Sequence, residues 1–381
     1  MTISAPGKLF IAGEWAILET GNPGIVAAIS KRAYINIRES SDNKIHINIK
    51  DYNIKDLIAE FGDVGLEFKK KLNSEKREKL IFLKTAIEIA LNYLQKSKPF
   101  RIDLTSQEMT LKIGANMKEI GLGSSAAIVV ATIAGILKFY GLDIKRKKVK
   151  ERIYKLAAIA HYFSQGEVGS GFDVAASTFG GLFLYKRFSP LWLKKKIEQK
   201  KSIREIIESI WPSFYYKRLK IPKNLNLIIG WTGKTASTTS LVQNLYKWKE
   251  KNRKLCRRLF SEISNLVRDL IKAWQREDKK IIIKLIRKNE NLLKRLGKES
   301  KLKLETKDLE RMSRIANRLG AAGKLSGAGG GDCGIAITFS NKNAEKIKKI
   351  WKKHRIYTVE AGISPEGVKE ENNSRRMGNT L

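Results

Sequence analysis

Hydrophobic and polar positions follow the period of a β-strand through most of the first 50 residues. Residues 24–37 (GIVAAISKRAYINI) and 44–50 (KIHINIK) are rich in β-branched side chains, and residues 19–24 (ETGNPG) have the composition of a turn. Strict alternation in residues 100–106 (FRIDLTS) predicts a further strand. Before it, residues 74–95 carry apolar positions at helical spacing, starting at Ser74, a residue type that favours helix N-termini.

The rest of the chain mixes helical spacing with glycine-rich interruptions. Residues 119–135 (EIGLGSSAAIVVATIAG) join a glycine–serine loop to a helix that is apolar on nearly every side. Residues 166–188 combine a glycine-rich turn, a short helix and a strand, and a strand at residues 224–231 (NLNLIIGW) precedes several helices. Because strands and helices alternate without a regular β–α–β rhythm, the sequence predicts an α+β fold.

Chain length and composition divide the molecule further. At roughly 150 residues per domain, 381 residues predict two domains. The stretch PLWLKKKIEQKKSIREIIESIWP turns basic, so we expect an N-terminal domain at 1–189, a basic connector or insertion at 190–212 and a C-terminal domain at 213–366. The polar residues 367–381 are expected to form a disordered tail.

Several classes of protein are excluded by composition. No run of 18 apolar residues occurs, so no membrane span is expected, and MTISAPGKLF lacks the features of a signal peptide. Two cysteines suit a reduced compartment, and three scattered histidines, His46, His161 and His354, argue against a zinc site. We expect a cytoplasmic protein that is a monomer or a homodimer.

The charge of the chain is strongly positive. Seventy-five Lys and Arg residues against 38 Asp and Glu give a formal net charge of +37. The basic residues are spread along the whole chain rather than gathered in one block, so they are expected to cover solvated helix faces. Nucleic-acid binding is kept only as a distant alternative. A positive field would also attract a phosphorylated substrate.

The loop before the apolar helix has the features of an anion site. A helix N-terminus presents unpaired N–H groups, Gly121 and Gly123 permit close approach, and Ser124 and Ser125 add hydroxyls. A dinucleotide fingerprint is rejected because the polar stretch GANMKE separates the loop from the preceding strand. A Walker A loop ending at Lys234 is rejected because the earlier glycine position holds isoleucine.

Three other stretches contain candidate chemistry, and each also has a plain structural explanation. Lys8 lies within the apolar stretch KLFIAGEW, either as a surface lysine or as a charge facing a site. Asp173 follows a glycine turn, either as a helix cap or as a general base. Five glycines in residues 327–334 form either a tight turn or a close approach of backbone to a ligand or loop.

The order of these motifs resembles the GHMP kinases, which include galactokinase and homoserine, mevalonate and phosphomevalonate kinases. The resemblance rests on the motifs P-x-K-L-F-I-A-G-E-W, G-L-G-S-S-A-A and S-G-A-G-G-G-D, which occur in this order from residue 6 to residue 332. The stretches GSGFDVAASTFGG, GWTGKTASTTSLV and SGAGGGDCGIAI look most like those of phosphomevalonate kinases. Two family prolines are missing, since NMKEI precedes the glycine–serine loop and Leu325 precedes the last motif.

The resemblance implies a fold and a set of roles. The N-terminal domain should resemble the second domain of ribosomal protein S5, the C-terminal domain should be ferredoxin-like, and the active site should lie between them. Lys8 and Asp173 would be catalytic, Ser124 or Ser125 would help hold Mg²⁺, and Gly327–Gly331 would pack against the glycine–serine loop. The implied contacts to the ATP phosphates are Gly121, Leu122, Gly123, Ser124, Ser125 and Ala126. The implied substrate-binding residues are Lys8, Ser170, Gly171, Lys234, Ser237, Thr238, Gly329 and Gly330.

The reaction that follows from the resemblance is ATP-dependent phosphorylation of 5-phosphomevalonate to 5-diphosphomevalonate in isoprenoid biosynthesis. Mevalonate kinase, or another small-molecule kinase of the same superfamily, is the alternative.

Overall fold

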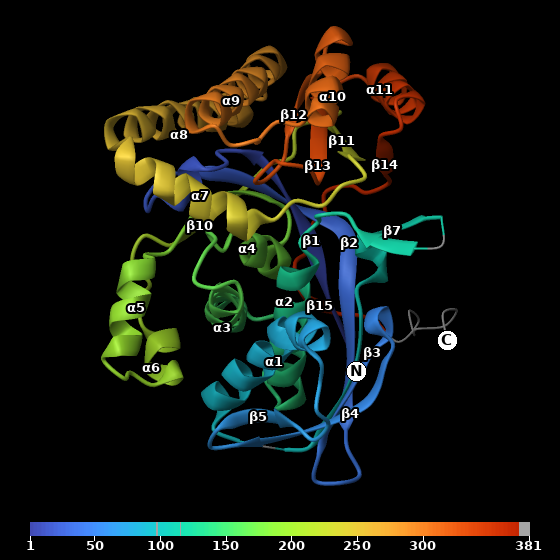
Figure 1. Ribbon diagram of the computed structural model, residues 1–381, viewed down its shortest axis with the longest axis vertical. Helices are drawn as coiled ribbons and strands as arrows, with labels where there is room; N and C mark the ends of the chain where they lie inside the picture. The colour runs from blue at the N-terminus through green and yellow to red at the C-terminus, as the bar shows by residue number, and fades with distance from the viewer. Residues whose placement is uncertain (97, 115, 373–381) are drawn as a thin grey trace.

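A computed structural model describes residues 1–96, 98–114 and 116–372 and has two domains, the first built on a large sheet (Figure 1). Strands β10-β9-β2-β6-β3-β4-β5 are hydrogen-bonded in that order, and β1 pairs with β2 and β15. Neighbours are antiparallel apart from the parallel pair β3 and β6. The strands are β1 (Thr2–Ala12), β2 (Gly24–Glu39), β3 (Ile45–Ile49), β4 (Ile54–Gly62), β5 (Gly65–Phe68), β6 (Phe100–Thr105), β9 (Leu182–Lys186), β10 (Tyr215–Leu219) and β15 (Lys369–Glu370).

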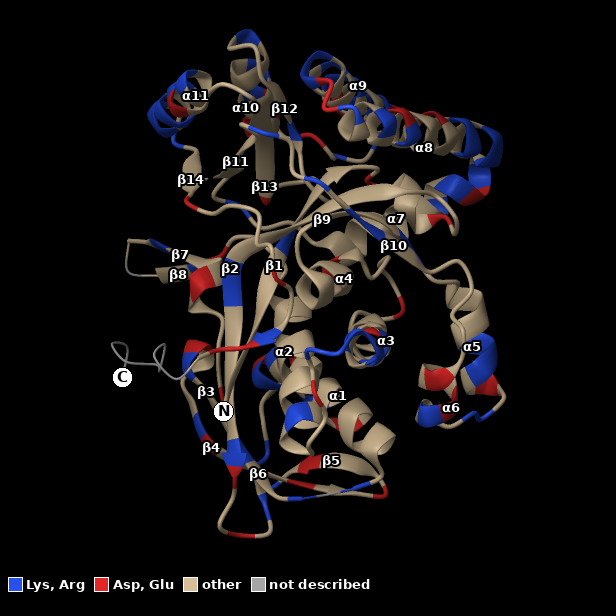
Figure 2. Cartoon of the chain, turned by 180° about the vertical axis from the view of Figure 1, so that it is seen from behind, with Lys and Arg blue, Asp and Glu red and all other residues tan. Residues whose placement is uncertain are grey.

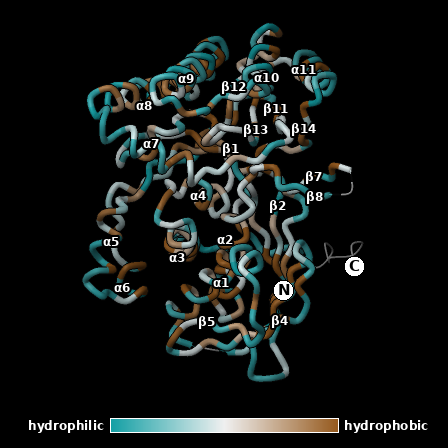
Figure 3. The backbone as a smooth tube through the Cα atoms, viewed as in Figure 1, coloured by the Kyte–Doolittle hydropathy of each residue, from teal (hydrophilic) through white to brown (hydrophobic). Residues whose placement is uncertain are grey.

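Four helices cover one face of this sheet, and the most apolar of them is enclosed. They are α1 (Ser74–Leu94), α2 (Ser124–Phe139), α3 (Lys147–Ser164) and α4 (Phe172–Phe179). Helix α2 packs against α1, α3 and α4 and against β1 and β2, which explains why it carries apolar residues on nearly every side. Figure 3 shows the hydrophobic colours gathering in α2 and the neighbouring strands. A hairpin, β7 (Thr110–Ile113) and β8 (Asn116–Glu119), precedes α2, and short 3₁₀ turns lie at Ala16–Leu18, Lys50–Tyr52 and Gln107–Met109.

The second domain is a four-stranded antiparallel sheet covered by helices. Its strands, β11 (Asn226–Trp231), β12 (Ala322–Leu325), β13 (Cys333–Thr338) and β14 (Tyr357–Val359), lie in the order β12-β13-β11-β14. Numbered within the domain, this order is 2-3-1-4, which is the ferredoxin-like arrangement. The helices are α7 (Thr238–Lys251), α8 (Arg253–Gln275), α9 (Lys279–Ser300), α10 (Lys307–Arg318) and α11 (Asn341–Lys353). The predicted α+β fold is confirmed.

Residues 190–212, expected as a basic connector or insertion, pack on the first domain. They form α5 (Pro190–Glu198) and α6 (Ile203–Glu208), and their apolar side chains Leu193, Ile206 and Trp211 are buried in the core of the first domain. Strand β10 then extends the large sheet, so the first domain continues to Leu219. The basic composition hid these helices in the sequence, because Lys194 and Lys195 of α5 and Arg204 of α6 are exposed while the apolar residues face the core.

The predicted disordered tail is wrong for residues 367–372. Val368 is buried, β15 pairs with the start of β1, and the Arg32 guanidinium donates to the carbonyl of Gly367 over 2.7 Å. The chain therefore returns from the second domain to the first sheet, a long-range pairing that a polar local sequence does not reveal. Residues 373–381 lie outside the described part.

The basic residues are distributed over both domains, and the outer helices α8, α9 and α11 carry many of them (Figure 2). Across the described residues, no helix combines the length and the apolar character needed to cross a membrane.

Candidate active site

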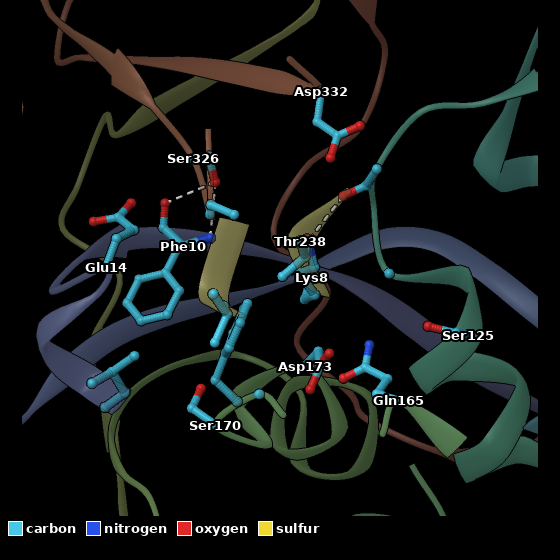
Figure 4. A pocket seen from close by; sticks show the side chains of 18 of the residues that line it. Lys8, Phe10, Glu14, Ser125, Gln165, Ser170, Asp173, Thr238, Ser326 and Asp332 are labelled. Atoms are coloured by element: carbon cyan, nitrogen blue, oxygen red, sulfur yellow. Dashed lines mark hydrogen bonds between the residues drawn. The ribbon is translucent and has the colours of Figure 1, made fainter. Parts of the chain in front are cut away.

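A cavity of about 210 Å³ opens where the two domains meet (Figure 4). Its walls come from β1, the loop before α2, the start of α4, helix α7 and the loop between β12 and β13, so five distant parts of the sequence converge there. The lining residues are Lys8, Phe10, Glu14, Trp15, Ile17, Leu18, Glu119, Gly121, Gly123, Ser124, Ser125, Gln165, Gly169, Ser170, Phe172, Asp173, Thr238, Val242, Ser326, Gly327, Ala328 and Asp332.

Lys8 is fixed beneath the glycine–serine loop and is not a surface lysine. Its backbone N–H donates to the carbonyl of Leu122 over 2.8 Å, and its Nζ donates to the carbonyl of Gly121, also over 2.8 Å. The ammonium group lies 5.7 Å from the ring centre of Phe172. These contacts hold the positive charge at the cavity wall, between the loop and α4.

The two loop glycines admit neighbouring side chains. Gly121 and Gly123 have φ of 72° and 85°. A Cβ on Gly123 would lie 2.8 Å from Cγ of Lys8, and a Cβ on Gly121 would lie 2.6 Å from Cγ of Asp332. Glycine is therefore required both for the backbone conformation and for the approach of a lysine and an aspartate.

The N-terminus of α2 faces the cavity with its N–H groups open. Gly123 is the N-cap residue, and among the described side chains none hydrogen-bonds these N–H groups as a cap. The Ser124 hydroxyl donates to Oε2 of Glu119 over 3.0 Å, and Oγ of Ser125 lies 3.1 Å from Nε2 of His161. The other two predicted loop residues, Leu122 and Ala126, are buried in the core.

Asp173 lies in the first turn of α4, opposite Lys8 (Figure 4). Its Oδ1 accepts from the N–H of Val174 over 2.9 Å, and its Oδ2 lies 3.8 Å from Nε2 of His161. Burial lowers the pKa of His161, so its ring is neutral near pH 7 even though Asp173 opposes the shift. Ser170 also lines the cavity, while Gly171 is the N-cap residue of α4 with φ of 74°.

Only some residues of the last glycine-rich stretch take part in the cavity and its walls. Ser326 hydrogen-bonds both the N–H and the carbonyl of Phe10, at 3.0 Å each, and so joins the second domain to β1. Asp332 reaches the glycine–serine loop at Gly121, and burial raises the pKa of its carboxyl. Gly329 and Gly330, expected to bind substrate, pack against Leu304 instead, and the N–H of Gly330 donates to its carbonyl over 2.7 Å. The expectation that all of Gly327–Gly331 packs on the loop is therefore wrong.

The start of α7 brings one predicted residue, Thr238, to the cavity. Thr238 lines the wall, whereas the Ser237 hydroxyl accepts from the N–H of Ser240 over 3.3 Å as a helix cap. Lys234 has an exposed side chain, and its carbonyl accepts from the N–H of Asp332 over 2.8 Å. Ser237 thus caps α7, and Lys234 binds the last glycine-rich stretch through its backbone; within the described chain neither residue belongs to the cavity wall.

Sequence reasoning missed several residues of the site. Glu119 stands directly before the loop, and its acidic side chain so close to an anion site was the available signal. His161 stands alone in the sequence, far from His46 and His354. It belongs to α3, and nothing in its spacing reveals that α3 packs against both α2 and α4.

Two family models match the chain. The model described as GHMP kinases N terminal domain matches residues 82–181, and the model described as GHMP kinases C terminal matches residues 270–356. The first match includes the glycine–serine loop and Asp173, and the second includes the last glycine-rich stretch.

Curated relatives are similar over nearly the whole chain. Phosphomevalonate kinase of Saccharolobus solfataricus is 30% identical, over 97% of this chain and 99% of that protein. Phosphomevalonate kinase of Streptomyces sp. (strain CL190) is 29% identical, over 96% and 97% respectively. Mevalonate kinase of Thermococcus sibiricus is 30% identical, over 88% of each chain.

Solved structures share the fold. The Lin0012 protein of Listeria innocua superposes with a TM-score of 0.85 at 27% identity, over 97% of this chain and 99% of that chain. Streptococcus pneumoniae phosphomevalonate kinase, in a complex with phosphomevalonate and AMPPNP, superposes with a TM-score of 0.79 at 22% identity, over 95% and 99%.

Proposed function

The chain belongs to the GHMP kinases, and we propose that it transfers the γ-phosphoryl group of ATP to the phosphate of 5-phosphomevalonate, forming 5-diphosphomevalonate for isoprenoid biosynthesis. The observation that carries the proposal is the convergence of Lys8, the open N-terminus of α2 and Asp173 on one cavity. Phosphoryl transfer depends mainly on positioning and on charge stabilisation, and these groups can supply both.

The glycine–serine loop is proposed to hold the ATP phosphates. Its first-turn N–H groups and the positive end of the helix dipole favour phosphate oxygens, and the hydroxyls of Ser124 and Ser125 add donors at the same point. Gly121 and Gly123 keep the backbone bare on the cavity side. This arrangement recognises phosphate rather than adenine.

A magnesium ion fits the oxygen groups beside the loop. The hydroxyl of Ser124 and the carboxylate of Glu119 lie 3.0 Å apart at the cavity wall, and Ser125 offers a second hydroxyl. Within residues 1–96, 98–114 and 116–372 there is no cluster of three or more His, Cys, Asp or Glu that could enclose a metal. One or two protein oxygens are what Mg²⁺ uses when substrate phosphates provide the remaining ligands. When bound, the ion would neutralise charge on the transferring phosphoryl group.

Lys8 is proposed to lie between donor and acceptor phosphates. Two anions must meet for this reaction, and the fixed ammonium group reduces their repulsion without needing to reorganise. Asp173 stands opposite, and its role depends on the acceptor. The second pKa of a phosphate monoester is about 6, so the attacking oxygen is largely ionised at neutral pH. Asp173 therefore orients the acceptor more than it removes a proton.

The rest of the cavity suits a small branched acid. Phe10, Ile17 and Val242 offer an apolar surface to a methyl-substituted carbon chain, and the hydroxyls of Ser170 and Thr238 can bind its polar groups. Lys234, Ser237, Gly329 and Gly330 are not assigned contacts to substrate.

Mevalonate kinase is the second candidate because relatives with that name are as similar in sequence, although over a smaller share of the chain. The deciding experiment measures ADP release by the purified protein with 5-phosphomevalonate or mevalonate as the acceptor. We expect kcat/KM for phosphomevalonate to exceed that for mevalonate by at least about 100-fold, because a site built for a phosphate discriminates strongly against an analogue lacking it. A preference for mevalonate would reject the proposal.

A further inference from the structure

His161 is a buried polar residue beneath the cavity that the reaction scheme above does not use. It belongs to α3, and its side chain is 3% exposed. Its ring packs on Phe82 of α1 with 5.3 Å between ring centres. The histidine ring is thus tightly packed within the helical layer of the first domain, behind the cavity wall.

One nitrogen of this ring faces two residues of the site. Nε2 lies 3.1 Å from Oγ of Ser125 and 3.8 Å from Oδ2 of Asp173. The other oxygen of Asp173 accepts from the N–H of Val174 within α4. His161 is therefore a polar group from a third helix that joins the first turn of α2 to the first turn of α4.

The charge environment favours one arrangement of the proton. A neutral ring that carries its hydrogen on Nε2 can donate toward the Ser125 oxygen and presents a positive edge to the Asp173 carboxylate. The hydroxyl hydrogen of Ser125 is then free to point into the cavity, where the phosphates of the nucleotide are proposed to lie. The bare nitrogen of the other tautomer would face a carboxylate, which is less favourable.

On the basis of the proposed kinase function, we propose that His161 is a positioning residue that sets both the Ser125 hydroxyl and the Asp173 carboxylate for phosphoryl transfer. It touches neither substrate nor nucleotide and acts through these two side chains. Because the reaction depends on alignment, releasing both groups by even 1 Å can lower the rate by about 100-fold.

The test compares His161→Phe with His161→Gln in the full chain. Phenylalanine keeps the packing against Phe82 and removes the nitrogen, whereas the glutamine amide nitrogen is as many bonds from Cβ as Nε2 and can replace it. We expect kcat of His161→Phe to fall by about 10- to 100-fold, with the KM for phosphomevalonate changed less than about threefold. His161→Gln should retain kcat within about fivefold of the unmodified chain.

A matched control is His46, a buried histidine between Asp42 and Asp56, with ring nitrogens 2.9 and 2.7 Å from their carboxylates. His46→Phe should lower the melting temperature and leave kcat unchanged. Calorimetric titration with a non-hydrolysable ATP analogue provides a readout other than turnover, and His161→Phe should weaken binding several-fold because the Ser125 hydroxyl is no longer oriented.

A double substitution separates positioning from simple packing. If His161 acts partly through Ser125, His161→Phe should cost less in a Ser125→Ala background than in the unmodified chain. Normal kcat in His161→Phe, or equal losses in His161→Phe and His161→Gln, would overturn the inference. If the unmodified chain phosphorylates mevalonate and not phosphomevalonate, the proposed function fails, and the same comparison with mevalonate still tests His161.

Discussion

The positions of individual side chains at the cavity are set by contacts with segments that are distant in the sequence. Lys8 illustrates this, because both its backbone N–H and its ammonium group bind carbonyls of the loop that precedes α2. The sequence left two explanations open for this lysine, and only the distance to Gly121 distinguishes them. A residue in an apolar strand cannot reveal which loop, more than 100 positions away, will lie over it.

Lys8→Ala should lower kcat by about 100-fold or more, as for the loss of a preorganised charge donor at a reacting centre. The ammonium charge is needed when the two anions approach each other. The substitution should therefore lower the reaction rate and leave the protein folded. Steady-state kinetics with phosphomevalonate measures it, and a thermal melt of the same variant checks that the fold is retained. A near-normal rate would remove Lys8 from the mechanism.

Asp173→Asn should be the milder change, with a loss of kcat smaller than that of Lys8→Ala. The acceptor phosphate is already largely ionised near pH 7, so an amide preserves most of what the carboxylate supplies in orientation. The same assay on both variants gives the ranking. A greater loss for Asp173→Asn would indicate that proton removal matters, as expected for a hydroxyl acceptor.

Elements with a strong local pattern were predictable, and elements defined by distant partners were not. The apolar stretch after the glycine–serine loop predicts a helix, and α2 spans Ser124–Phe139, because its apolar residues and its glycine–serine start are local signals. Helices α5 and α6 and strand β15 depend on what they pack against. The candidate site followed the same rule, since the motifs singled out Lys8, the loop and Asp173, which line one cavity, whereas the place of His161 and the packing of Gly329 on Leu304 required the tertiary structure.

Gly123→Ala tests the α2 N-terminus as an element of the site. The added methyl group would collide with the Lys8 side chain, and alanine would have to adopt a backbone φ of 85°. Because both the loop and Lys8 would be displaced, kcat should fall by at least about 10-fold.

Gly141 near the other end of α2 supplies the control. It has φ of 90°, and a Cβ added there would meet no other atom within 4 Å, so Gly141→Ala should cost stability by about 1 kcal/mol and leave kcat unchanged. Equal kinetics in the two variants would show that the contact with Lys8 is irrelevant.

At the scale of the whole molecule, a buried charge cluster joins the domains beside the cavity. Lys324 of β12 forms a fully buried ion pair with Glu14, which follows β1, and Asn289 of α9 donates to the same carboxylate over 3.2 Å. Glu290 also faces Lys324, and burial raises the pKa of this carboxyl to about 8. Lys324 opposes this shift and the nearby Glu305 carboxyl adds to it, so the protonated form of Glu290 avoids a further buried negative charge.

This cluster predicts a pH dependence of stability. The pKa of Glu290 is raised in the folded state, so its contribution is complete below its unfolded pKa of about 4.5 and is lost as the pH rises toward 8. Glu290→Gln cannot ionise, so its stability relative to the unmodified chain should increase between pH 5 and pH 8. Urea unfolding at several pH values measures the difference, and a constant difference would contradict the assignment.

The central claim, that a phosphate and not a hydroxyl accepts the phosphoryl group, is tested most directly by ³¹P NMR of the product. The protein is incubated with ATP, Mg²⁺ and 5-phosphomevalonate, and the spectrum is followed as ADP accumulates. The account predicts that the single phosphomonoester signal is replaced by two coupled signals of a diphosphate monoester. An unchanged phosphomonoester signal, with turnover only when mevalonate is supplied, would contradict it.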